Sequence, residues 1–171
     1  MTWRLAYWII FACALGVYGT MLGCTLPAVS AGADGLVPFD MRPGGYTGEE
    51  ARQFLAALSD EGRKIYLGPQ HKLDLVYPTL LAVVLIGASW ALVPARGLAA
   101  VLIAAVLVGA GADYLENLRV SGLLTYEGEV TDSMVAAANQ ATLIKSGATT
   151  LAMCGVLVAL ISAGWRKWIR R

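Results

Sequence analysis

Three polar residues that follow a long apolar run are the first candidates for chemistry in this sequence. Residues 97–112 carry no charged side chain, and Asp113, Glu116 and Asn117 come directly after them. Their spacing of i, i+3 and i+4 places all three on one face of a helix. In a pocket of low dielectric such a face can do acid–base work, hold a polar ligand or pair with a buried lysine. Lipid does not tolerate it, so we expect it to face protein or water.

The elements that position this face belong to a membrane protein. The chain has 171 residues, of which 57% are hydrophobic and 15% charged, and its mean hydropathy is +0.62. A soluble domain has about 25% charged residues. Several runs approach the roughly 20 apolar residues that cross a bilayer. We therefore expect one membrane domain, residues 1–171, and the net charge of +1 gives no indication of nucleic-acid binding.

The expected fold is all-α: an integral membrane four-helix bundle with an extracytoplasmic loop and a short amphipathic helix as a lid. The lid is residues 30–68, which hold a loop rich in glycine and proline and then a charged helix opened by a capping box of Thr47 and Glu50. The first apolar segment also resembles a signal peptide, but its length favours a retained helix. The transmembrane helices are expected at about 5–29, 70–93, 98–118 and 134–164.

Charge and depth place the polar groups near one membrane face. Basic residues lie at both termini and in the turn around Arg96, which predicts that both termini are cytoplasmic. Counting about 20 residues from each cytoplasmic end marks the outer edge of the hydrocarbon layer. Pro78 frees the carbonyl of the residue four positions before it and should kink the second helix. The count predicts a polar cup at the outer rim made by Asp74, Tyr77, Asp113, Tyr114, Glu116, Asn117, Asn139 and Lys145.

Above the cup, the lid loop supplies Asp40, Arg42 and Tyr46, and Asp40 and Arg42 can pair with each other. No catalytic residue, metal site or cofactor is predicted. The three cysteines are scattered without a CxxC motif, which argues against a thiol oxidoreductase and a zinc site. One histidine, His71, cannot supply paired haem ligands.

Several functions are compatible with such a cup. Lys145 can pair with Asp113 in a network that fixes helix register, as in a structural or accessory membrane protein. Small-residue faces on the first, third and fourth helices suit close packing within the bundle or with partner helices. Alternatively, Asp74, Asp113 and Glu116 bind a lipid or small molecule, with acid–base catalysis as a variant. Transport ranks lowest, because the charges lie far from the bilayer midplane.

Three motifs carry a resemblance to a known group of proteins. They are Phe-Asp-x-Arg-Pro at 39–43, Leu-Asp-x-x-Tyr-Pro at 73–78 and Ala-Asp-Tyr-x-Glu-Asn at 112–117. Together they resemble a family of bacterial four-helix integral membrane proteins of unknown function. The resemblance implies the fold, a multi-pass place in the bacterial inner membrane, and one site shared by the three motifs.

We therefore expect a non-enzymatic structural, accessory or interaction protein of the inner membrane. Its partners would be the lipid bilayer and either another membrane protein or a lipid or small-molecule ligand, with no nucleic acid. The alternative is a protein that handles a lipid or small molecule through its intramembrane carboxylates.

Overall fold

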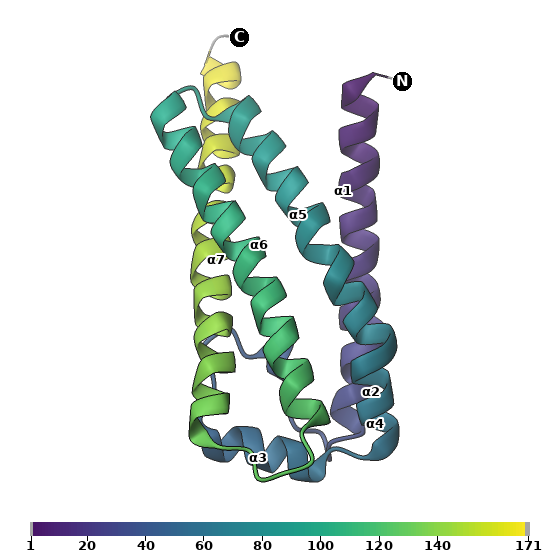
Figure 1. The fold of residues 1–171 in the computed structure, drawn as a ribbon. Helices are drawn as coiled ribbons and strands as arrows, with labels where there is room; N and C mark the ends of the chain where they lie inside the picture. The colour runs from purple at the N-terminus through teal and green to yellow at the C-terminus, as the bar shows by residue number, and fades with distance from the viewer. Residues whose placement is uncertain (1, 170–171) are drawn as a thin grey trace.

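The computed structural model describes residues 2–169, and this part of the chain is helical with no strand. Its long helices run alongside one another, while short elements cross one end of the bundle (Figure 1). Four helical segments are long and apolar enough to cross a membrane, in agreement with the predicted number: Trp3–Ala31, Asp60–Leu92, Arg96–Thr125 and Asp132–Arg166.

The first of these segments is continuous but not uniform. It consists of α1 (Trp3–Thr20), a π-helical turn η1 (Met21–Thr25) and α2 (Leu26–Ala31). Pro27 lies in the first turn of α2, directly after the wider turn. Proline removes one N–H from the helical ladder, and the neighbouring π turn lets the chain continue through that interruption.

The second segment begins earlier than the sequence suggested. The capping box of Thr47 and Glu50 opens α3 (Gly48–Ala57) as predicted. The side chain of Ser59 then caps α4 (Asp60–Ile65), which continues through a π-helical turn η3 (Tyr66–Gln70) into α5 (His71–Leu92). The expected lid boundary at residue 68 and helix start at residue 70 are thus wrong. Residues 60–68 are helical and continuous with α5, because the π turn accommodates Pro69 without a break.

The last two helices are also longer than predicted. α6 runs over Arg96–Thr125 and α7 over Asp132–Ile169, so only residues 126–131 connect them. The predicted end of α6 at residue 118 is wrong because its last two turns bury Val120, Leu123 and Leu124. Tertiary packing of these apolar side chains keeps the polar end of α6 helical, an effect that local composition does not reveal.

Small residues let α6 and α7 pack closely. A Cβ atom on Gly109 would lie 2.7 Å from Thr149 Oγ1, and one on Gly155 would lie 2.5 Å from Leu102 Cδ2. The predicted small-residue faces of these two helices are therefore used inside the bundle. On α1 and η1, by contrast, a Cβ atom added at Gly16, Gly19 or Gly23 would have no neighbouring atom within 4 Å.

The residues before α4 form a cap segment (residues 32–59) that packs on the ends of the long helices. It includes a short 3₁₀ turn, η2 (Phe39–Met41), as well as α3, which crosses the lower end of the bundle in Figure 1. The rings of Phe39 and Phe54 lie 5.0 Å apart, and Phe39 also packs on Tyr46. Burial of each such ring contributes roughly 1.5–3 kcal/mol toward holding the segment against the helices.

Candidate functional site

Lys145 of α7 lies at the centre of a buried polar network. Its Nζ atom contacts Glu116 Oε2 and lies 3.5 Å from Asp113 Oδ1. Glu116 is fully buried, and the Lys145 side chain is 17% exposed. The three-residue spacing on α6 directs both carboxylates toward α7, so the predicted pairing of Lys145 with Asp113 is present and Glu116 is a second partner.

The other oxygen of Glu116 is bound as well. Thr142, which is buried on α7, donates its hydroxyl hydrogen to Glu116 Oε1. Thr142 and Lys145 are three residues apart and so share one face of α7. Thr142 was not among the predicted site residues, although this spacing identifies it. Both oxygens of the buried carboxylate are thus satisfied by α7, as low-dielectric burial of a charge requires.

A second set of contacts fastens α6 to α5 at the proline. Pro78 lies inside α5 and cannot donate to the carbonyl of Asp74, four residues before it. Asn117 Nδ2 donates to that carbonyl oxygen at 3.2 Å, in a buried position. Tyr114 donates its hydroxyl hydrogen to the next carbonyl, that of Leu75, at 2.9 Å. The polar face of α6 therefore supplies a hydrogen-bond donor to the backbone carbonyl that the proline leaves without one.

The structure does not bring the two predicted tyrosines into hydrogen bonds with the carboxylates. The ring of Tyr77 stacks on Tyr18 of α1, with centroids 5.3 Å apart and planes at 18°. Tyr114 is 38% exposed and reaches across α5 to Leu75 and Thr79. Both tyrosines pack between helices. Tyr114 does so because it is one position away from the helix face shared by Asp113, Glu116 and Asn117.

The cap segment reaches the network through Asp40. Gln70 Nε2 donates to Asp40 Oδ2 at 3.2 Å, while Gln70 Oε1 accepts from Thr25. The expected pair of Asp40 and Arg42 is wrong, because Arg42 Nε donates instead to the carbonyl of Val37 at 2.9 Å. Gln70 is fully buried and was not predicted, although its four-residue spacing from Asp74 places it on the polar face of the same helix.

Burial raises the pKa of Asp40 from 3.8 to about 7. The charge of Lys145 opposes this shift, whereas Glu116 and Asp113 add to it. Asp113 and Glu116 contact Lys145, and Asp40 lies close enough to interact with all three charges. Like charges this close in a dry environment disfavour one another, so protonation of the cap carboxyl near neutral pH relieves part of the repulsion.

A separate contact binds the cap segment to α7. Asn139 Oδ1 accepts a hydrogen bond from the backbone N–H of Tyr46 at 2.9 Å. Gly45 has a φ of +85°, and a Cβ atom there would collide with the Asn139 side chain. Asn139 therefore positions the loop and does not contact the carboxylates. Burial raises the pKa of Tyr46 to about 12, so its hydroxyl group is neutral at physiological pH.

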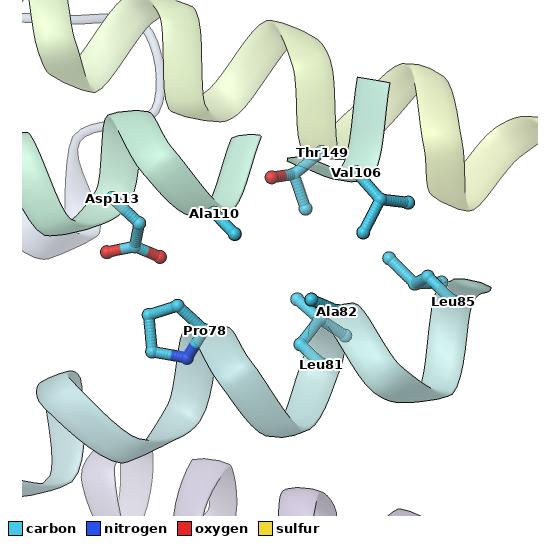
Figure 2. A pocket seen from close by; sticks show the side chains of 8 residues that line it. All are labelled: Pro78, Leu81, Ala82, Leu85, Val106, Ala110, Asp113 and Thr149. Atoms are coloured by element: carbon cyan, nitrogen blue, oxygen red, sulfur yellow. The ribbon is translucent and has the colours of Figure 1, made fainter. Parts of the chain in front are cut away.

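Little space remains beside the charged groups. Asp113 faces Pro78 across a cavity of about 10 Å³, enough for a single water-sized probe (Figure 2). A second cavity of the same size adjoins Asp74, where His71 Nδ1 lies 3.4 Å from Ser121 Oγ. Within residues 2–169, no group of three His, Cys, Asp or Glu side chains has the geometry to hold a metal ion. The first cavity is lined by Pro78, Leu81, Ala82, Leu85, Val106, Ala110, Asp113 and Thr149.

Comparisons with models of protein families, with curated proteins and with solved structures found no match to this chain.

Proposed function

We propose that this chain is a non-enzymatic structural or accessory protein of the bacterial inner membrane, whose polar network fastens an extracytoplasmic cap to a four-helix bundle. The observation that carries the proposal is the mutual satisfaction of Lys145, Glu116 and Asp113 beside a cavity of only about 10 Å³. A substrate pocket is typically about 300–1,000 Å³. The charged groups therefore pair with one another and leave too little space for a substrate.

The network joins three of the long helices and the cap segment. Lys145 and Thr142 join α7 to α6, Asn117 joins α6 to α5, and Gln70 joins α5 to the cap segment. Buried polar groups cost free energy when they lose their partners, so a shifted helix register is disfavoured. This argues for a network that selects one arrangement of the helices and the cap.

The membrane orientation rests on the distribution of charge. Arg4, Arg96 and Arg166 belong to the end of the bundle opposite the cap segment, and basic residues favour the cytoplasmic side. The cap would then face the periplasm. The accessory role is supported by α1 and η1, where Gly16, Gly19 and Gly23 leave room for a partner helix to approach closely.

The proposal is tested by extracting the protein from its source membrane with a lipid-retaining polymer and identifying by mass spectrometry what accompanies it. We expect a protein partner at a fixed stoichiometry, and its loss from the Gly19→Leu variant. Gly111→Leu is the matched control, because Gly111 is also open to its surroundings but lies on α6. A preparation that contains a bound lipid or metabolite and no protein partner would favour the alternative, a ligand site.

Replacement of Asp113 by asparagine distinguishes the structural or accessory role from the alternative, a ligand site. Under the proposed function the variant melts at a lower temperature in detergent, because Lys145 loses one carboxylate. Under the alternative it folds normally but loses the stabilisation conferred by the co-purified molecule.

A further inference from the structure

A larger cavity lies away from the polar network. It has a volume of about 260 Å³ and is formed by α3, α4, the C-terminal end of α6 and the 126–131 connection. Two arginines face it from different helices, Arg52 of α3 and Arg63 of α4. The apolar part of its wall comes from Leu55, Leu123, Tyr126 and Val130.

Both guanidinium groups are held in place and keep free donors. Arg52 Nη1 lies 2.7 Å from Asp132 Oδ1, and Arg63 Nη1 donates to the carbonyl oxygen of Leu124. A guanidinium group has five N–H donors. In the described part of the chain, the remaining donors of the two arginines have no protein acceptor. The carboxylate of Asp132 is 84% exposed, so an incoming anion competes with it at little cost.

Tyr126 adds a polar atom and a wall to the cavity. Its ring lies against Gly128, where a Cβ atom would come within 2.9 Å of Tyr126 Cε1. The absence of a side chain at residue 128 thus lets the ring fold over the connection. Tyr126 is half-exposed and lines the same cavity.

The depth of the cavity suits a ligand from the membrane surface. Asn117 lies about 20 residues from the start of α6 and marks the edge of the hydrocarbon layer. Leu123 is six residues further along the same helix, which is about 9 Å at 1.5 Å per residue. A headgroup layer extends roughly 5–8 Å beyond the hydrocarbon on each side. Leu123 therefore lies at or just beyond the outer limit of the headgroups, and the two arginines line the same cavity.

We propose that this cavity binds a phosphate group, with Arg52 and Arg63 as its donors and the apolar wall against the attached glycerol or carbon chain. Two arginines that line one cavity suit phosphate, because guanidinium groups bind its oxygens in pairs. The volume of about 260 Å³ admits a phosphate with a small organic portion, so the acyl chains of a phospholipid would lie outside it. The same chemistry is offered by an anionic lipid headgroup and by a soluble phosphate monoester.

The test measures binding to the purified full-length chain in a neutral detergent. The probes are dihexanoyl phosphatidic acid, dihexanoyl phosphatidylcholine, glycerol 3-phosphate and inorganic phosphate. We expect the phosphatidic acid to bind, and Arg52→Gln to weaken that binding about tenfold or more. Lys64→Gln removes the same charge from an exposed position on α4 beside Arg63, and should leave binding unchanged.

The probes distinguish the source of the phosphate. Tighter binding of phosphatidic acid than of glycerol 3-phosphate indicates a lipid headgroup, and equal binding indicates a soluble monoester. Arg63→Lys, which keeps a charge and a donor for the Leu124 carbonyl, should weaken binding without loss of the fold. Equal binding by wild type and Arg52→Gln would overturn the proposal. So would an equal loss in Lys64→Gln, because attraction by net charge alone would explain it.

Discussion

Replacement of Lys145 by methionine probes the centre of the polar network. Methionine keeps the length and apolar stem of lysine but removes the single cation that contacts Glu116 and Asp113. Removal of one partner from a buried ion pair typically costs about 3–5 kcal/mol, because the remaining charge is left unpaired. For a chain of this size that corresponds to a fall in melting temperature of roughly 6–20 °C.

A second substitution shows whether the loss comes from the unpaired carboxylates. Glu116→Gln keeps an acceptor for Thr142 but removes the negative charge. If the cost arises from unpaired charge, the double variant Lys145→Met with Glu116→Gln should be more stable than Lys145→Met alone. We expect a coupling free energy of about 1–3 kcal/mol between the two sites. Full recovery is not expected, since Asp113 also loses its partner.

The assay must not depend on thiol exposure, because Cys13, Cys24 and Cys154 are all exposed in the folded chain. Far-UV circular dichroism during heating in detergent, together with size-exclusion chromatography of heated samples, reports the loss of helix and of the folded particle. The reasoning would be refuted by a Lys145→Met variant that melts within about 2 °C of wild type, or by strictly additive effects of the two substitutions.

Three further substitutions, the last with a matched control, test separate contacts by the same melting assay. Burial raises the pKa of Asp40 from 3.8 to about 7, so its stabilising contribution is complete below pH 4 and is lost as pH rises toward 7. Asp40→Asn should remove this loss and be more stable than wild type at pH 8, by up to about 4 kcal/mol; parallel pH profiles would contradict this. Asn117→Leu should cost about 1–3 kcal/mol, since the buried Asp74 carbonyl loses its donor; an unchanged melting temperature would count against that bond. Gly109→Ala should cost about 1–3 kcal/mol by overpacking, whereas Gly19→Ala, in an open position on α1, should cost nothing; equal effects would argue against the packing described.

Local patterns in the sequence predicted much of the fold. Four apolar segments, the capping box at Thr47 and the helix-breaking chemistry of Pro78 depend on neighbouring residues and on the length needed to cross a bilayer. The one-sided spacing of Asp113, Glu116 and Asn117 likewise follows from helical geometry. The site residues on α6 could therefore be recognised before any contact was known.

Other parts of the site depend on contacts between distant segments. Asp40 turns toward Gln70 rather than Arg42, because the aromatic residues around it place η2 against the helix ends. Thr142 becomes a site residue only because α7 lies beside α6 in one register. No local signal separates these arrangements, since each partner lies more than twenty residues away along the chain.

Local patterns alone indicated four helices long and apolar enough to cross a membrane, with a polar face on the third, because periodicity and hydrophobic length are local properties. The tertiary structure decided that side chains of neighbouring helices cover this polar face. It brought Lys145 and Thr142 onto Glu116 and Asn117 onto the carbonyl freed by Pro78, and it left about 10 Å³ beside Asp113. Buried charges can line a binding pocket or pair with one another to hold helices together. Which of the two occurs depends on the side chains that fill the space around them, and only the packing between helices determines those side chains.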